Sequence, residues 1–202
     1  MKLRIANIGF PAIHHTIVPV ELQSSGSLSD YDALIFDPQF VVGSMTQDVG
    51  ALQLRQGQVR ELLEVKAGAV VTLVKPSVTA GYFLLDEEMW NGSLTASITP
   101  EIGFNFSLSR TASWAGRDYF YELQEEPWRF DGNFSADSLL SHGRTIATNS
   151  VGKVISAQFD VRNGKILFLP CTFGSNTQRT GFAVFRAVES LLKTVRPWTS
   201  SS

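Results

Sequence analysis

The chain has 202 residues, of which 44% are hydrophobic and 18% are charged, and its formal net charge is −2. This length and apolar content suit one α/β domain with a buried core, whereas the lack of a Lys/Arg block gives nucleic-acid binding little electrostatic basis. A single cysteine excludes an intrachain disulfide, and three histidines without ligand spacing predict no metal site. Because no apolar run approaches about 18 residues, we expect a cytoplasmic protein without membrane contact. We also expect no cofactor.

The first part of the chain predicts three strands. LRIANIGF (residues 3–10) is an apolar run that ends at a proline. Ile17–Leu22 predicts a short second strand, and Pro19 limits this strand to the edge of a sheet. YDALIFDP (residues 31–38) predicts a further strand, closed by an Asp-Pro pair.

A helix and a fourth strand follow. Residues 52–66 have helical spacing, and the buried side would be formed by Leu52, Val59, Leu62, Leu63 and the stem of Lys66. AVVTLVKP (residues 69–76) is rich in β-branched residues and predicts a strand buried on both faces, which is typical of parallel sheets.

The middle third, about residues 77–144, holds most of the aromatic residues and shows no long helical period. FNFSLS (residues 104–109) and DYFYEL (residues 118–123) alternate as strands do. We therefore expect an irregular, aromatic-rich insertion or cap of short strands and loops, packed on the main sheet.

The last part of the chain predicts two or three strands and a helix. Turns are expected at residues 150–152 and 162–164, the latter with the Asn-Gly pair that favours hairpins. Residues 178–195 predict a helix, and residues 197–202 predict a tail or linker. The buried stripe of this helix would consist of Phe182, Phe185, Val188, Leu192 and Val195.

These elements predict one α/β domain over residues 1–196. A mostly parallel central sheet would carry flanking helices and an antiparallel edge hairpin, with the aromatic-rich inserted region beside it.

Four predicted strands end at a proline: residues 9–11, 36–38, 74–76 and 168–170. If these strands are parallel, their ends share the carboxyl edge of the sheet, where open α/β sheets build their sites. The alternative is that proline only terminates each strand. A site at this edge would gather the following residues: Gly9, His14, His15, Asp37, Lys75, Ser77, Cys171 and Thr172.

Cys171 is open to two interpretations. A catalytic thiolate would need activation by His14 or His15, and Ser77 is a weaker candidate nucleophile. The alternative is a small buried side chain at the junction of strand and loop. LPCTFG (residues 169–174) lacks the glycines that flank a strained nucleophile elbow, which favours the structural interpretation.

Other residues at this edge suit ligand binding. Thr172, Ser175, Asn176 and Arg179 belong to TFGSNTQRTG (residues 172–181), a loop that could bind a small anion through backbone N–H groups. Ser175 and Asn176 would serve equally as helix N-caps.

Two charged residues end neighbouring predicted strands. Asp37 and Lys75 could bind a ligand, or they could pair with each other across the strand ends.

Four segments together resemble the class I glutamine amidotransferase-like domains, which have a flavodoxin-like α/β fold. These are LRIANIGF, DYDALIFDP, VRELLEVKAGAVVTLVKP and GKVISAQFDVRNGKILFLP. The enzymes of this family carry a Gly-x-Cys-x-Gly elbow after a central strand and a late His-x-Glu. Here Ser77 follows the corresponding strand without flanking glycines, and His142 has no acidic residue two positions on. The resemblance therefore implies a non-catalytic member of the fold.

Three functional hypotheses remain open. The first is a non-catalytic module that binds a partner protein or a small ligand at the carboxyl edge, as part of a larger protein or complex. The second is a degenerate amidotransferase-like hydrolase that uses Cys171 or Ser77. The third is a nucleotide or phosphate sensor that uses the Thr172–Gly181 loop.

Overall fold

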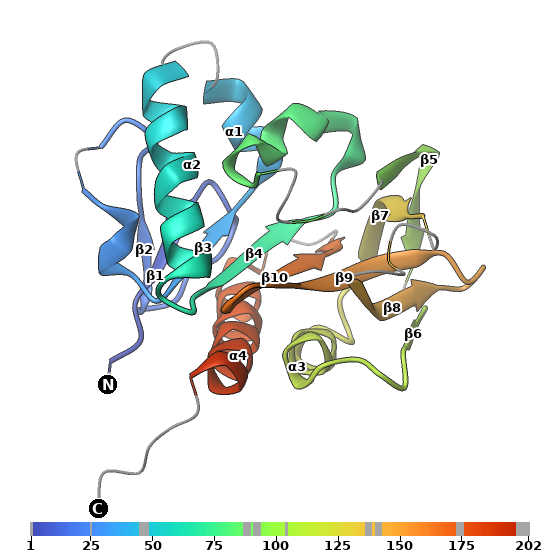
Figure 1. The fold of residues 1–202 in the computed structure, drawn as a ribbon. Coiled ribbons are helices and arrows are strands. Elements are labelled where there is room, and N and C mark those ends of the chain that lie inside the picture. The colour runs from blue at the N-terminus through green and yellow to red at the C-terminus, as the bar shows by residue number, and fades with distance from the viewer. Residues whose placement is uncertain are drawn as a thin grey trace, which may run out of the picture.

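The computed structural model describes residues 2–24, 26–44, 49–86, 90, 94–103, 105–135, 139, 143–172 and 176–196. The predicted tail at residues 197–202 and the candidate Ser175 lie outside these ranges. One mixed sheet forms the centre of the molecule, and helices cover both of its faces (Figure 1).

Five strands of this sheet run parallel to one another. Their order is β10-β4-β3-β1-β2, and the register of each neighbouring pair is continuous. Pro19 lies in the edge strand, as the sequence predicts, because it cannot donate a ladder hydrogen bond there. The bounds are β1 (Ile5–Ile8), β2 (Ile17–Pro19), β3 (Ala33–Phe36), β4 (Ala69–Leu73) and β10 (Gly164–Leu169).

The other strands pair in antiparallel fashion. β9 joins them to the parallel half, since it pairs with β10 on one side and with β7 and β8 on the other. The bounds are β5 (Leu94–Gly103), β6 (Phe106–Leu108), β7 (Trp128–Phe134), β8 (Gly143–Asn149), β9 (Val154–Val161) and β11 (Cys171–Thr172).

Two layers of helices enclose the sheet. α1 (Pro38–Ser44), α2 (Val49–Glu64) and the 3-10 helix η2 (Pro76–Leu84) lie on one face, and a second 3-10 helix, η1 (Leu28–Asp30), packs against α2. α3 (Trp114–Glu122) and α4 (Thr177–Val195) lie on the other face (Figure 1). The predicted α/β fold, with a parallel core, flanking helices and an antiparallel edge, is confirmed.

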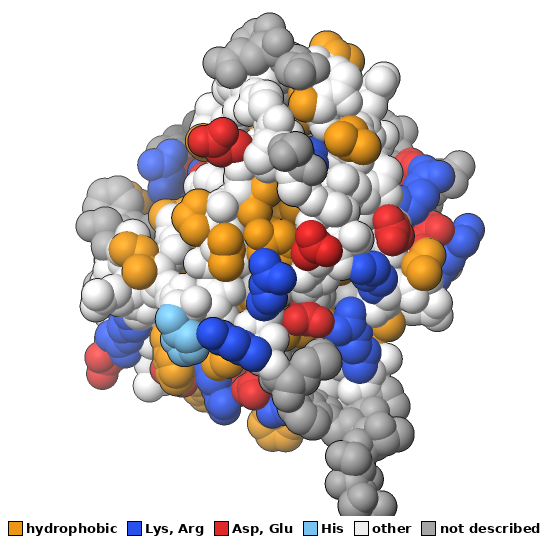
Figure 2. Space-filling model, turned by 90° about the vertical axis from the view of Figure 1, so that its left-hand side faces the viewer, with side chains coloured by type: hydrophobic (Ala, Val, Ile, Leu, Met, Phe, Trp, Pro, Cys, Tyr) orange, Lys and Arg blue, Asp and Glu red, His pale blue; other side chains and the backbone are white. Residues whose placement is uncertain are grey.

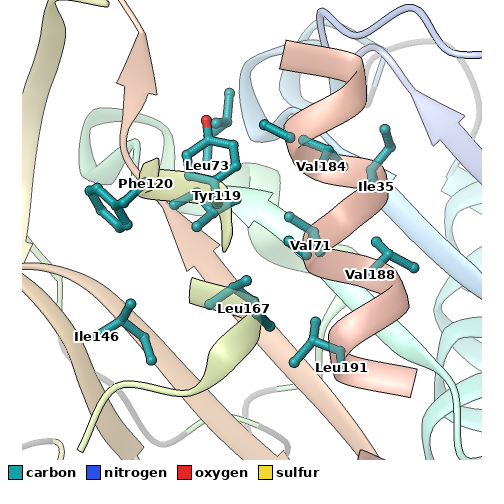
Figure 3. Close-up of a cluster of buried hydrophobic side chains, with 14 of the residues drawn as sticks. Ile35, Val71, Leu73, Tyr119, Phe120, Ile146, Leu167, Val184, Val188 and Leu191 are labelled. Carbon is teal, nitrogen blue, oxygen red and sulfur yellow. The ribbon is translucent and has the colours of Figure 1, made fainter. Parts of the chain in front are cut away.

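Side chains alternate between the two faces of the central strands. Ile35, Val71 and Leu167 face α4 and α3, whereas their neighbours Leu34 and Val70 face α2. Figure 3 shows the first of these clusters, in which Val184, Val188 and Leu191 of α4 pack over the sheet. Both faces of the parallel strands are therefore buried, which explains their continuous apolar sequences.

Two details of the prediction are wrong. Residues 118–123 lie mainly in α3, a helix that Ser113 caps by accepting a hydrogen bond from the Gly116 N–H. On α4, Phe182 is 43% exposed instead of buried. The face that meets the sheet carries mainly smaller side chains, because they let the helix lie close to it: Ala183, Val184, Ala187, Val188, Leu191 and Leu192.

The middle third of the chain joins the sheet more closely than an irregular cap would. β7 pairs with β5 and with β9, and α3 packs against α4. Its aromatic residues fill the cores on the two faces of the sheet, with Phe106, Phe120 and Trp128 on one face and Phe134 on the other.

Candidate functional site

The carboxyl ends of four parallel strands meet at one edge of the sheet. Ile8 pairs with Phe36, Phe36 with Thr72, and Thr72 with Phe168, so β1, β3, β4 and β10 end at the same level. A cavity of about 610 Å³ lies at this edge, within the size range of ligand pockets. It is lined by Phe10, Pro11, Asp37, Gln39, Leu73, Lys75, Ser77, Tyr119, Arg129, Asp131, Cys171, Thr177 and Thr180.

Asp37 and Lys75 form an ion pair in this cavity. The Lys75 ammonium lies 2.9 and 2.7 Å from the two Asp37 carboxylate oxygens, and Asp37 Oδ1 also accepts a hydrogen bond from the Gln39 N–H. The Tyr82 hydroxyl fixes the strand end, because it donates to the Leu73 carbonyl and accepts from the Lys75 N–H. The pairing that the sequence allowed is present, and the Lys75 and Asp37 side chains are only 20% and 13% exposed, respectively.

A second ion pair comes from β7. Arg129 Nε donates to Asp131 Oδ1 at 2.6 Å, and this contact raises the pKa of the guanidinium above its ordinary value. The sequence patterns did not indicate these two residues. The available signal was the i, i+2 spacing on a strand whose alternate residues Trp128 and Phe130 are buried.

Cys171 lies in β11, opposite Arg129 of β7. Burial raises the pKa of its thiol to about 12. Lys75 and Arg129 lower this pKa, whereas Asp131 and Asp37 raise it further. The side chain is therefore a neutral thiol at neutral pH, and not the thiolate that nucleophilic catalysis requires.

His14 and His15 are not among the described residues that line the cavity. The His14 ring stacks on Phe185 of α4, with ring centroids 4.4 Å apart, and its Nδ1 lies 2.8 Å from the Thr16 hydroxyl. Burial, together with the neighbouring His15, lowers the pKa of His14. These contacts place the ring along the side of α4, about two helical turns beyond the Thr177 end that faces the cavity.

Three further candidate ligand-binding residues, Gly9, Asn176 and Arg179, make contacts that support the fold. Gly9 adopts φ 71°, and a Cβ there would clash with the Phe40 ring. Asn176 caps α4 by accepting a hydrogen bond from the Arg179 N–H at 3.0 Å. The Arg179 guanidinium donates to the Glu122 carbonyl and pairs with Glu125 and Glu126, which leaves it poorly placed to bind an anion.

The segment that follows Cys171 is described only in part. Thr172 pairs through its backbone with Trp128 of β7. Residues 172–181 were expected at this edge as a loop, and two of them, Thr177 and Thr180 in the first turn of α4, line the cavity.

Other classes of site find less support in the structure. The described residues contain no group of three or more His, Cys, Asp or Glu side chains placed to hold a metal ion. None of the described helices combines the length and apolar composition needed to cross a bilayer. On the face drawn in Figure 2, Lys and Arg side chains lie among Asp and Glu side chains, so their charges offset one another.

Comparison with known proteins shows a relationship at the level of the fold. No protein-family model and no curated protein sequence matches the chain. PurLQS from Thermotoga maritima matches with a TM-score of 0.58 at 10% identity, over 96% of this chain and 100% of that one. A Thermoplasma acidophilum protein assigned to GMP synthase matches with a TM-score of 0.51 at 12% identity, over 98% and 97% of the two chains. A cytoplasmic protein from Salmonella typhimurium LT2 has a TM-score of 0.51 at 11% identity, over 89% and 81%.

The chain thus has a fold similar to that of glutamine amidotransferase-like proteins. At these identities the likeness concerns the fold alone, and the site has to be interpreted from its own residues.

Proposed function

We propose that the chain is a non-catalytic module that binds a small polar ligand in the cavity at the carboxyl edge of its sheet. The supporting observation is the set of residues that line the cavity: two ion pairs, several hydroxyls and a neutral thiol. Such convergent polar groups orient a ligand.

The hydrolase hypothesis has weaker support. A nucleophile needs a base within hydrogen-bond reach, and no histidine is among the described residues that line the cavity. The raised pKa of Cys171 opposes thiolate formation, and Ser77 has no histidine or lysine among its described hydrogen-bond partners. The anion-sensor hypothesis is weakened because Arg179 is engaged with α3 and the residues after it.

The proposal is tested by thermal-shift screening of the whole chain against a metabolite panel, followed by titration calorimetry of each compound that stabilises it. A ligand at 100 times its Kd stabilises the folded state by about 2.7 kcal/mol. This amounts to a rise in Tm of about 5–10 °C for a chain of this size.

Two matched variants then place the binding site. Ser77 and Thr79 are both exposed residues of η2, but only Ser77 lines the cavity. Ser77→Trp should fill the cavity and abolish binding, whereas Thr79→Trp should leave the Kd unchanged. Binding that survives Ser77→Trp would place the ligand elsewhere, and turnover of the ligand that depends on Cys171 would refute a non-catalytic role.

A further inference from the structure

The charges that line the cavity balance one another, and this feature narrows the class of ligand. The described lining contains two cationic side chains and two carboxylates, arranged as the pairs Lys75–Asp37 and Arg129–Asp131. All four charges act on the thiol of Cys171, so both pairs lie around the same part of the cavity.

Each pair still presents open hydrogen-bonding groups. Lys75 Nζ has three N–H donors, and its contacts within the described chain are to Asp37 alone. The terminal nitrogens of Arg129 and the second carboxylate oxygen of Asp131 make no hydrogen bond within the part of the chain that the structure describes. Donors and acceptors therefore stand side by side at two places in the cavity, with the hydroxyls of Ser77, Thr177 and Thr180 beside them.

A charged ligand gains little from this arrangement. An anion attracted by Lys75 or Arg129 is repelled by the carboxylate 2.6–2.9 Å from that side chain. A cationic ligand attracted by Asp37 or Asp131 is likewise repelled by the paired ammonium or guanidinium. The ligand would also lose its hydration on entering the cavity, and the net charge there offers no compensation.

An uncharged hydroxyl suits the same arrangement, because it donates to a carboxylate and accepts from a neighbouring ammonium or guanidinium. Hydrogen bonds to charged groups are roughly twice as strong as those between neutral groups. Several hydroxyls on one small frame would satisfy both pairs together, and the apolar side chains of Phe10 and Leu73, which also line the cavity, would contact the C–H groups of that frame.

We infer that the cavity takes an uncharged polyhydroxylated ligand of the mono- or disaccharide class, whose hydroxyls bridge the Asp37–Lys75 and Arg129–Asp131 pairs. This inference rests on the proposed function, since it names the chemistry of the ligand for the same cavity.

Titration calorimetry on the whole chain at low salt tests the inference with matched sugars. The neutral probes are glucose, galactose, mannose, maltose and lactose, and the charged probes are glucuronate, galacturonate, glucosamine and galactosamine. At least one neutral sugar should bind about tenfold more tightly than each of the four charged probes, which corresponds to about 1.4 kcal/mol.

The outcomes separate this inference from the function on which it rests. Tighter binding of a uronate or amino sugar, or binding of other compounds but no neutral sugar, would refute the saccharide class and leave a ligand-binding cavity standing. Failure of every compound in the metabolite panel to bind in a Ser77→Trp-sensitive manner would refute both.

Variants that change the charge of the cavity give a sharper test. Asp131→Asn leaves the lining with one excess positive charge, so affinity for the neutral sugar should fall and affinity for its uronate should rise, reversing their order. The control is Asp160→Asn, which alters a similar pair, Asp160–Lys165, on the β9–β10 hairpin outside the cavity lining. Circular dichroism would establish that both variants are folded. An unchanged order of affinities in folded Asp131→Asn would overturn the inference.

Discussion

The two halves of the sheet are stabilised in different ways. In the parallel half, β1, β3, β4 and β10 consist mainly of aliphatic residues and are buried on both faces beneath α2 and α4. In the antiparallel half, the core of one face is built from aromatic rings supplied by three separate segments. Phe106, Phe120 and Trp128 contact one another with ring centroids 4.7–5.8 Å apart. The parallel half therefore depends on repeated local patterns, whereas the antiparallel half depends on contacts between distant residues.

The cavity lies where these halves meet. Asp37 and Lys75 belong to the parallel half, and Arg129 and Asp131 belong to β7 of the antiparallel half. The site is complete only when both halves are folded and correctly placed. Substitutions in one half, in the other half, or at the boundary between them should therefore change the stability of the protein in distinguishable ways.

The largest effect is expected from Trp128→Ala. Trp128 is 0% exposed and contacts three aromatic rings, so its truncation should lower the free energy of unfolding by about 3–5 kcal/mol. Urea unfolding followed by circular dichroism measures this change. If the halves form one cooperative unit, the transition stays single, as it should for Leu62→Ala in the parallel half. A two-step transition in Trp128→Ala would show that the halves unfold separately.

The parallel half contains a less expected element, the fully buried Arg55 of α2. Its guanidinium donates to the carbonyls of Glu21, Leu22, Ser24 and Gly26, and it has no carboxylate partner among the described residues. Burial accordingly lowers the pKa of Arg55. The side chain holds the loop that leads from β2 to β3.

Arg55→Met should therefore destabilise the protein by about 2–4 kcal/mol, because the buried carbonyl of Leu22 and three part-buried carbonyls lose their donor. The matched control on the same helix is Arg60→Met, which breaks an ion pair with Asp86 at a half-exposed position and should cost less than about 1 kcal/mol. Both values follow from urea titration. Equal effects of the two substitutions would contradict the structural role assigned to Arg55.

The sequence specified the parallel half well for a physical reason. β-branched runs that end in proline mark buried strands, and parallel pairing then places Asp37, Lys75, Ser77 and Cys171 at one edge without further information. The same patterns could not reveal Arg129 and Asp131, because the placement of β7 depends on pairing with β5, β9 and β11.

The helix α3 was missed for a related reason. Residues 118–123 alternate in polarity over a short span, and a helix is favoured there by the Ser113 cap before it and by packing against α4. Asp118 accepts a hydrogen bond from the Ser190 hydroxyl, and the Glu122 carbonyl accepts one from Arg179. Such tertiary contacts override local preference. Arg55 was overlooked likewise, since a lone arginine on an apolar helix face carries no sign of the loop that it binds.

Glycines offer a smaller test of the difference between the halves. Gly9 in the parallel half and Gly152 in the antiparallel half both have positive φ, 71° and 80°. A Cβ at Gly9 would meet the Phe40 ring, whereas a Cβ at Gly152 would meet nothing within 4 Å. Gly152→Ala should therefore cost about 1 kcal/mol from backbone strain alone, and Gly9→Ala about 2–3 kcal/mol. Thermal unfolding would measure both changes, and similar costs would contradict tight packing at Gly9.

The smallest expected effect concerns Cys171, at the boundary between the halves. Burial raises the pKa of its thiol from 9.0 to about 12, so between these values the thiol ionises in the unfolded chain but not in the folded one. The stabilisation is complete below pH 9 and is lost as the pH rises toward 12. From pH 8 to pH 10 this one group should remove about 1 kcal/mol of stability. Burial also raises the pKa of Tyr82 and Tyr119, with a smaller contribution from Cys171, and this adds a further loss of stability at alkaline pH.

Comparison of the wild type with Cys171→Ala isolates the contribution of the thiol. The loss of unfolding free energy between pH 8 and pH 10 should be about 1 kcal/mol smaller in the variant, since burial, the main cause of the tyrosine shifts, is present in both proteins. Urea titrations at the two pH values give this difference. The native thiol should also react with iodoacetamide at pH 8 far more slowly than the unfolded chain does. An unchanged pH dependence together with rapid alkylation would contradict the partial burial of Cys171 in β11.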